Sequence, residues 1–190
     1  MADSDDFDRS VFINCPFDTE YHPLFEAIVF TVSIAGFRPR CALEASNAGA
    51  NRLTKTLDII DGCRYGIHDL SRTQPGAYGL PRFNMPFELG LDIGCKRYGS
   101  DVHRKAKSLL ILDRSRFRYQ KFLSDIAGQD IRHHSSNPRR ATGCVRDWLS
   151  LESRNFKIPG GDHIFARYRE FRKGASPLCV GRNQRLRPSG

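Results

Sequence analysis

Short apolar runs alternate along the chain with longer segments that have the periodicity of amphipathic helices. The run at residues 10–15 (SVFINC) is rich in β-branched and aromatic residues, and a proline follows it. Such a run is typical of a buried strand that ends in a loop. Residues 21–35 carry apolar side chains at the i, i+3, i+4 and i+7 spacing of one helix face, and Gly36 follows. This spacing predicts a core helix.

The same alternation continues to about residue 151. The segment at 107–113 (KSLLILD) is the clearest buried strand, and Pro39 indicates a strand near a sheet edge because proline donates no backbone hydrogen bond. Further strands are predicted at 37–43, 65–70 and 130–133, and further helices at 51–63, 84–99 and 138–151. The predicted fold class is therefore α/β, a flavodoxin-like doubly wound sheet of about five mostly parallel strands with a basic C-terminal extension.

A chain of 190 residues is long enough for one domain with appendages. Residues 1–9 are polar and acidic, and we expect a disordered leader there. The α/β domain is expected at residues 10–153. Residues 154–190 are expected to form the basic extension, in which a linker leads into a helix-like segment at 162–173.

The formal net charge of +9 lies mostly at one end of the chain. From residue 154 onward, nine Lys and Arg residues stand against two acidic residues, a net charge of +7 that leaves +2 for the rest. A broad nucleic-acid face on the folded part is therefore not the leading interpretation, although the extension itself could bind nucleic acid.

Neither a membrane segment nor a secretion signal is indicated. No apolar run approaches the roughly 20 residues that span a bilayer, and the N-terminus is acidic, unlike a signal peptide. We expect a cytoplasmic protein. The six cysteines show no C-x-x-C pair, and His133 and His134 have no partner at metal-ligand spacing, so reduced thiols and no metal site are expected.

Three catalytic or nucleotide-binding motifs are absent from the sequence. No G-x-G-x-x-G follows the first strand, and neither a G-x-x-x-x-G-K-[ST] phosphate loop nor a G-x-S-x-G nucleophile elbow occurs. This disfavours dinucleotide-fold dehydrogenases, P-loop enzymes and serine hydrolases with that elbow.

The strongest candidate site lies at residues 65–98. A strand ends at His68 and Asp69, a loop rich in Gly, Pro and Arg follows, and a helix opens at Asn84 and carries Glu88. Ligands of open α/β sheets sit beyond the carboxyl ends of the strands, so a strand end that faces this helix start predicts a pocket. We expect Asn84 to cap the helix and the loop to act as a lid.

Glu88 has two open interpretations. A carboxylate near a helix start is stabilised by the helix dipole, which would explain the residue without any chemistry. Alternatively, an acid partly buried between Phe87 and Leu89 is suited to stabilise or attack an oxocarbenium ion at a ribose C1′. Gly90 and Gly94 are expected to let this helix pack closely on a strand.

Other polar residues could surround the same pocket. Asn14 and Asp18 lie at and just past the end of the first strand, where they either face a pocket or serve as turn residues. Arg72 and Arg82 lie on the predicted lid and could contact a phosphate or remain solvated charges. His68 is interpreted as a strand-end histidine with its hydrogen bonds satisfied.

Several phrases of the sequence resemble known families. FINCPFD, IHDLSR and FNMPFELGLDIG together resemble a bacterial TIR-like group, and the Glu88-Leu89-Gly90 helix followed by KSLLILD is similar to a passage of nucleoside 2-deoxyribosyltransferases. The resemblance covers roughly residues 10–150. It implies a flavodoxin-like fold in which a helix-borne glutamate cleaves or transfers an N-glycosidic bond, with NAD as the substrate of the TIR enzymes.

Carried over residue by residue, the resemblance implies that Glu88 is the catalytic acid and that Asp69 holds the ribose or orients Glu88. Asn14 and Asp18 would then lie beside the substrate. The residues predicted to bind substrate are Asn14, Asp18, Arg72, Arg82 and Asn84.

The expected function is therefore that of an N-glycosidase, an NAD(P)+ nucleosidase or a deoxyribosyltransferase-like enzyme acting on NAD or a related nucleotide, in defence against phage. NAD is then the substrate, and no cofactor or metal is needed because its leaving base is already cationic. The resemblance also implies a homo-oligomer. One alternative is a non-catalytic TIR-like domain that senses a nucleotide or self-associates, and another is nucleic-acid binding through residues 154–190.

Overall fold

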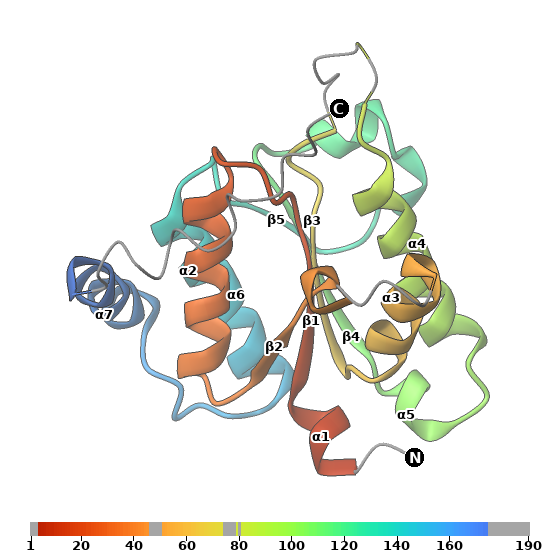
Figure 1. Cartoon of the computed structure of the whole chain (residues 1–190), viewed down its shortest axis with the longest axis horizontal. Coiled ribbons are helices and arrows are strands. Elements are labelled where there is room, and N and C mark those ends of the chain that lie inside the picture. The colour runs from red at the N-terminus through yellow and green to blue at the C-terminus, as the bar shows by residue number, and fades with distance from the viewer. Residues whose placement is uncertain (1–3, 46–50, 74–78, 80, 175–190) are drawn as a thin grey trace, which may run out of the picture.

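The computed structural model describes residues 4–45, 51–73, 79 and 81–174, which form a five-stranded parallel sheet. The strand order is β2-β1-β3-β4-β5. The strands are β1 (Ser10–Asn14), β2 (Arg38–Arg40), β3 (Tyr65–Asp69), β4 (Ser108–Asp113) and β5 (Ile131–His133). This order, with helices on both faces (Figure 1), confirms the predicted flavodoxin-like α/β fold.

Helices cover the two faces of the sheet (Figure 1). α2 (His22–Ile34) and α6 (Pro138–Glu152) lie on one face, and α3 (Arg52–Asp61) and α4 (Asn84–Tyr98) lie on the other. The shorter helical segments are α1 (Ser4–Arg9), η1 (Ala42–Ala45), α5 (Val102–Lys105), η2 (Arg118–Lys121) and η3 (Ser124–Ile126). Among the residues that the structure describes, no helix combines the length and apolar character needed to cross a membrane.

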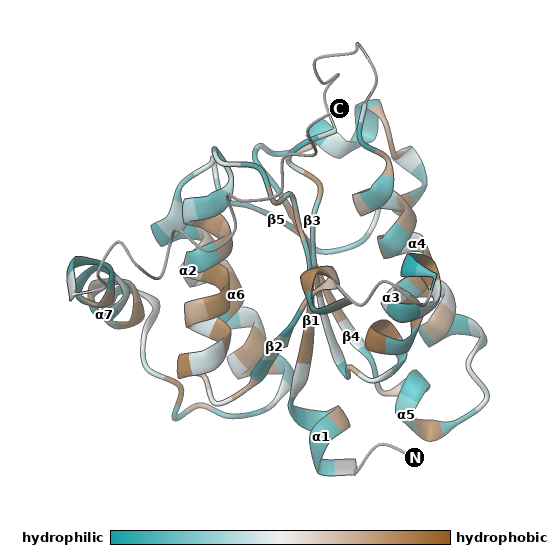
Figure 2. Cartoon of the chain, in the orientation of Figure 1, coloured by the Kyte–Doolittle hydropathy of each residue, from teal (hydrophilic) through white to brown (hydrophobic). Residues whose placement is uncertain are grey.

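Successive side chains of β1 enter different cores, as the pleat of a strand requires. Val11 and Ile13 belong to the larger core beneath α2 and α6, whereas Phe12 packs with Ile60 and Cys63 beneath α3. Figure 2 shows that apolar residues make up much of α2 and recur along α6 beside it. The same alternation decides on which face each polar strand-end side chain lies.

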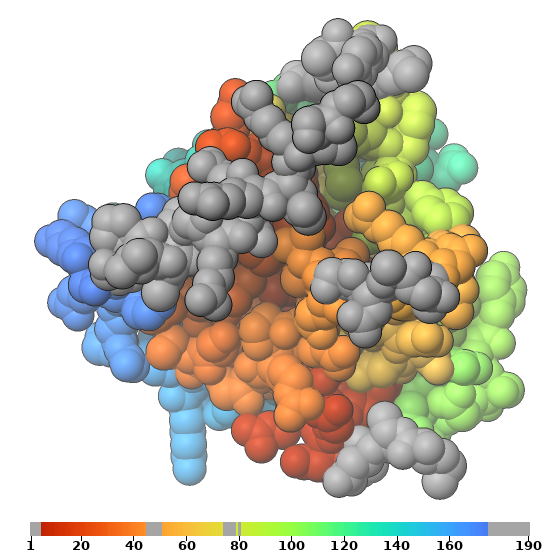
Figure 3. Space-filling model, in the orientation of Figure 1, coloured from red at the N-terminus to blue at the C-terminus, as the bar shows by residue number. Residues whose placement is uncertain are grey.

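The folded core continues beyond residue 153, where the basic extension was expected to begin. Ile158 and Ile164 are buried in the larger core, and α7 (Gly161–Gly174) packs across α2 and α6. The Tyr168 hydroxyl donates a hydrogen bond to the Glu26 carboxylate of α2, with 3.0 Å between the oxygens. Residues up to 174 therefore belong to the fold, and Figure 3 shows α7 in blue at one margin of the molecule.

The N-terminal leader also contributes to the fold. Residues 4–9, expected as a disordered leader, form α1, and its Phe7 is buried. Residues 1–3 and 175–190 lie outside the described residues, as do residues 74–78 and 80 of the loop interpreted as a lid.

Two expectations about α4 are corrected by the structure. The N-cap residue is Phe83 rather than Asn84, and no side chain caps the helix. Phe83 already has helical backbone angles, so Asn84 lies inside the first turn and not at the capping position. Gly90 and Gly94 do not pack on a strand, because a Cβ atom at either position would meet nothing within 4 Å.

Candidate active site

A cleft of about 310 Å³ lies beyond the carboxyl ends of the strands, between β1 and α4. It is lined by residues 14–18, by Arg52 at the start of α3, and by Arg82, Asn84, Met85 and Glu88. From β1 the chain first adds β2 on one side and then β3 on the other side. Open α/β sheets bind ligands at this point, where the strand order changes direction. Five of the seven predicted site residues line this one cleft: Asn14, Asp18, Arg82, Asn84 and Glu88.

Glu88 lies about one turn into α4 and is partly buried. Burial raises the pKa of its carboxyl group, while the positive charge of Arg52 acts in the opposite direction. A carboxylate that has lost part of its hydration interacts more strongly with a positive charge that develops nearby. This is the property that stabilisation of an oxocarbenium ion requires.

Behind the cleft, four buried polar residues form a continuous chain of contacts. Asn14 Nδ2 lies 3.0 Å from His68 Nδ1, and His68 Nε2 lies 3.0 Å from Asp92 Oδ2. Asp92 Oδ1 in turn lies 3.2 Å from Lys107 Nζ. All four side chains are at most 3% exposed, so this chain of polar groups is shielded from water.

The donors and acceptors in this chain follow from the chemistry of its members. An amide NH2 group can only donate, so His68 Nδ1 accepts from Asn14 and the proton lies on Nε2, which donates to Asp92. The second hydrogen of Asn14 goes to the Met85 carbonyl at 2.9 Å. Oδ1 is then the Asn14 atom left without a protein partner among the described residues. Asn14 therefore faces the cleft as a hydrogen-bond acceptor.

Lys107 explains why a carboxylate is tolerated at Asp92. Its ammonium group donates to the Ile60 carbonyl at 2.7 Å and to the Cys63 carbonyl, at the end of α3. A cation is favourable there because helix carbonyls carry partial negative charge. Lys107 thus joins the end of α3 to Asp92 of α4, and a buried ion pair results.

Gly66 makes room for this pair on β3. A Cβ atom at this position would lie 2.5 Å from Asp92 Oδ2 and 2.9 Å from His68 Nε2. These separations are shorter than any normal contact with a carbon, so Gly66 is required for the close approach of α4 to the strand.

Asp18 organises the positive side chains near the mouth of the cleft. Its carboxylate lies 3.2 Å from Arg72 and 3.3 Å from Arg82, and it accepts a hydrogen bond from the Tyr21 backbone. Arg82 lines the cleft, whereas Arg72 lies outside it and also pairs with Glu20. Asp18 is thus engaged with protein groups and holds the guanidinium group of Arg82 at the cleft.

The structure does not bring Asp69 to Glu88. His68 points toward α4, which carries Glu88. Asp69 is the next residue of β3 and therefore points to the opposite face of the sheet. Asp69 is fully buried and accepts hydrogen bonds from Tyr21, Ser71 and His134, the last at 2.9 Å. Burial alone would raise the pKa of Asp69, but the hydrogen bonds, first that from His134, outweigh it and lower the pKa.

Ser71, His134 and Asp69 resemble a catalytic triad only in composition. The Ser136 backbone N–H donates to His134 Nδ1 at 3.0 Å, so the ring proton lies on Nε2, which faces both Ser71 Oγ and Asp69. The ring therefore offers Ser71 a donor and has no lone pair to take its proton. This cluster is not arranged for nucleophilic catalysis.

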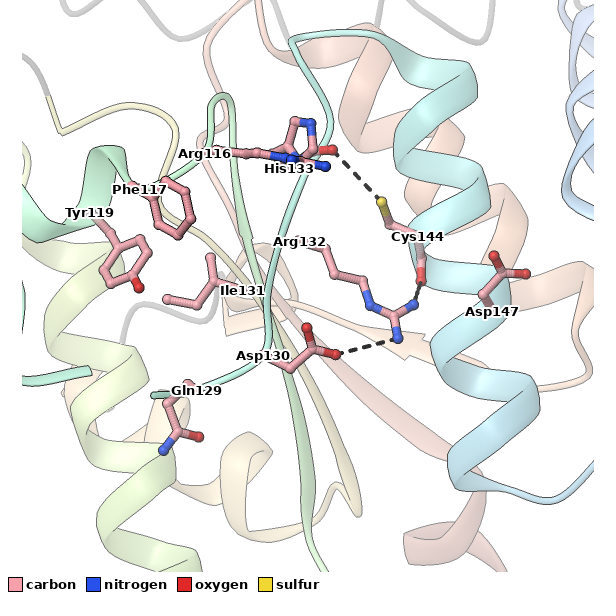
Figure 4. A pocket seen from close by; sticks show the side chains of 10 residues that line it. All are labelled: Arg116, Phe117, Tyr119, Gln129, Asp130, Ile131, Arg132, His133, Cys144 and Asp147. Atoms are coloured by element: carbon pink, nitrogen blue, oxygen red, sulfur yellow. Dashed lines mark hydrogen bonds and ion pairs between the residues drawn. The ribbon is translucent and has the colours of Figure 1, made fainter. Parts of the chain in front are cut away.

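A hollow of about 500 Å³ at the other side of the molecule offers weaker chemistry. It lies along β5 and the facing side of α6 (Figure 4), where Arg132 bonds the Cys144 carbonyl at 3.2 Å and pairs with Asp130 at 3.5 Å. Asp130 and Asp147 are exposed, and burial raises the pKa of the Cys144 thiol, which makes it less reactive. Its charged groups are thus paired with each other or solvated.

The sequence did not indicate that Arg52 lines the first cleft or that His68, Asp92 and Lys107 lie in contact behind it. Two signals were present: Asp92 follows Glu88 at the i+4 spacing of one helix face, and Gly66 interrupts a buried strand. Lys107, just before an apolar strand, gave no comparable signal.

The fold and the cleft together define a flavodoxin-like α/β protein with a candidate ligand site beyond the carboxyl ends of β1 and β3. Comparison with models of protein families and with curated proteins gives no match to this chain. In the part of the chain that the structure describes, no group of three His, Cys, Asp or Glu residues is arranged to hold a metal.

Proposed function

We propose that the protein is an N-glycosidase that cleaves the base–ribose bond of NAD or a related nucleotide, with Glu88 as its catalytic carboxylate. The observation that carries this proposal is the partly desolvated Glu88 in a cleft beyond β1 and β3. The resemblance of the sequence to TIR-like and deoxyribosyltransferase-like proteins supports the same chemistry.

In the proposed reaction, the bond between ribose C1′ and the base nitrogen breaks, and its electron pair stays with the base. For NAD the departing base is cationic and leaves as neutral nicotinamide. The positive charge passes to the ribose, where the Glu88 carboxylate stabilises it or bonds to C1′. Water then adds to C1′ and loses a proton, which completes the hydrolysis.

The surroundings of Glu88 match the parts of such a substrate. The Asn14 acceptor is suited to a ribose hydroxyl, and Arg52 and Arg82 can neutralise a phosphate at the mouth of the cleft. The cleft lies at the lower end of the range of about 300–1,000 Å³ for small-molecule sites, which fits one nucleoside unit.

The test is nicotinamide release from NAD by the purified protein and by its Glu88→Gln variant. Removal of the carboxylate is expected to lower the rate at least about a hundredfold. Glu170→Gln is the matched control, because Glu170 is exposed on α7, and its rate is expected to equal that of the unchanged protein. Equal release by the Glu88→Gln variant would remove Glu88 from the mechanism.

A second candidate is a non-catalytic domain that senses a nucleotide through the same cleft and self-associates. Asp69 is enclosed and Asp18 is engaged by two arginines, so Glu88 is the acid left for chemistry in this cleft. Assembly upon nucleotide addition without nicotinamide release would favour this candidate. A cytoplasmic role in defence against phage, as part of a homo-oligomer, belongs to the proposal through the resemblance.

A further inference from the structure

The two edge strands of the sheet, both short, differ in how they are protected. β2 has Pro39 at its centre, and both of its arginines pair with carboxylates. Proline and charged side chains are common means by which an edge strand avoids pairing with another chain. β5 contains no proline, and the side chain of its Arg132 is turned to the Cys144 carbonyl of α6. The edge at β5 is therefore the less protected one.

Alternate residues of β5 direct their backbone groups away from the sheet. The Asp113 carbonyl of β4 accepts a hydrogen bond from the His134 N–H at 3.0 Å, so the backbone of His134 faces β4. Because successive residues of a strand face opposite neighbours, Ile131 and His133 face outward. Their N–H groups and the Ile131 carbonyl have no hydrogen-bond partner in the part of the chain that the structure describes. β5 thus presents an open row of donors and acceptors.

The hollow of about 500 Å³ leaves room for a further strand along this edge (Figure 4). α6 borders it on one face of the sheet and Phe117 and Tyr119 border it on the other, with β5 between them. Phe117 is 65% exposed, and its φ of 58° is unfavourable for a residue with a side chain. Exposed aromatic rings of this kind are frequent contacts in protein interfaces. An extended segment beside β5 would find both backbone partners and an aromatic wall.

The two ends of the hollow carry opposite charges. Arg116 lines the end at which β5 stops, together with His133, and it forms no ion pair within the described ranges (Figure 4). Asp130 lines the end at which β5 starts, and its side chain is 81% exposed although Arg132 lies 3.5 Å away. Two copies placed antiparallel would bring the Arg116 of each to the Asp130 of the other. This charge complementarity favours a second copy of the chain over an unrelated peptide.

We propose that two copies of this chain associate through β5, antiparallel about a two-fold axis at Arg132. The His133 N–H of each copy donates to the Ile131 carbonyl of the other, and the Ile131 N–H donates to the His133 carbonyl, so that one sheet continues through both copies. The strand is short, so a weak, concentration-dependent dimer is expected. The pairing leaves the cleft at Glu88 free and is independent of the proposed glycosidase activity.

The test is sedimentation velocity of the full chain from micromolar to near-millimolar concentration, at which dimers are expected to form. His133→Pro removes the outward N–H and no bond to β4, and it should weaken association at least about tenfold. His133→Ala is the matched control, because it removes the same side chain and keeps the N–H. It should associate as the unchanged protein does. Thermal unfolding checks that both variants are folded.

A second pair of variants tests the antiparallel arrangement without altering the backbone. Arg116→Asp and Asp130→Arg each bring like charges together across the two-fold axis, so each variant alone should dimerise more weakly. An equimolar mixture of the two should recover the association, because every such contact then joins opposite charges again.

Three results would overturn the proposal. They are a monomer at every concentration, equal association of the two His133 variants, and a mixture of the charge variants that associates no better than its components.

Discussion

The two polar side chains at the end of β3 lie in different environments although they are consecutive in sequence. His68 points toward α4, where it joins Asp92 and Lys107 to the open cleft through Asn14. Asp69 points toward α2 and α6 and is enclosed by hydrogen-bond donors. One side of the strand leads to the cleft at Glu88, and the other lies in a closed cluster of hydrogen bonds.

The comparison shows two ways of stabilising a buried carboxylate. Asp92 is neutralised by an ammonium group, so its ion pair depends on a second charge that must itself be satisfied. Asp69 is held by a phenol, a hydroxyl, a backbone N–H and an imidazole, as polar groups around an ion can replace its hydration. The two carboxylates should therefore respond differently to the loss of a partner.

The largest effect is expected from Lys107→Met, which leaves Asp92 buried without its cation. The free energy of unfolding should fall by about 3–5 kcal/mol, the usual effect of removing one member of a buried pair. Urea denaturation measures this change. Lys105→Met, at an exposed position of α5, is the control and should change stability little.

The Lys107→Met result has an internal check. Adding Asp92→Asn to Lys107→Met should restore part of the lost stability, because the unpaired charge is then removed. A single Lys107 variant as stable as the unchanged protein would show that Asp92 does not need the ammonium group.

Asp69→Asn should have the next largest effect, a loss of about 2–3 kcal/mol at pH 7, since hydrogen bonds to a charged acceptor are strong. The folded-state pKa of Asp69 lies below its unfolded value. Its stabilisation is therefore present above about pH 4, near the unfolded pKa, and is lost as the pH falls through the lower, folded pKa. Unfolding free energies from pH 7 to pH 3 should decline less steeply in the variant.

The control for Asp69→Asn is Asp58→Asn, at an exposed position of α3. It should leave both the stability at pH 7 and the pH profile nearly unchanged. An Asp69→Asn variant with the full acid sensitivity of the unchanged protein would contradict the role given to the donors around Asp69.

Gly66→Ala and Gly90→Ala form a matched pair for the close approach of α4 to β3. The methyl group at position 66 would collide with Asp92 and Leu109, so a loss of about 1–3 kcal/mol is expected. At position 90 the methyl group meets open space, and the higher helix propensity of alanine should add up to about 1 kcal/mol. Opposite signs in urea denaturation support this reading, and equal effects would contradict it.

Glu88→Gln should have the smallest effect, a slight gain in stability. Burial raises the folded-state pKa of Glu88, so ionisation above the unfolded pKa slightly disfavours the folded state. The variant should be more stable at pH 7 by less than about 1 kcal/mol and equal in stability at about pH 3, where both states are protonated. A clear loss of stability at pH 7 would indicate that Glu88 has a structural role.

Much of the fold was predictable because its strands are short apolar runs and its helices have one apolar face. The β1 run and the α2 periodicity follow this rule, and both elements appear close to the predicted bounds. The packing of α7 on the core was not predictable, because most of its residues are polar or basic and only Ile164 and Tyr168 are buried.

The candidate site was predictable in position but not in its inner structure. Asn14 and Glu88 were found because they lie at a strand end and a helix start, which sheet topology brings together. Asp69 lies at the end of a strand, as Asn14 does, and was expected in the same pocket for that reason. The alternation of side chains along β3 places it on the other face. The partnership of Asp92 with Lys107 depends on a contact between elements that local patterns do not encode.

The docking of α7 on α2 has a practical consequence for anyone who shortens this chain. The ring of Phe30 lies 5.6 Å from that of Tyr168 and 5.5 Å from that of Phe171 between centroids, so a protein that stopped near residue 153 would expose Phe30. Exposed apolar surface of this kind promotes aggregation. Tags and fusion partners are therefore best joined after residue 174.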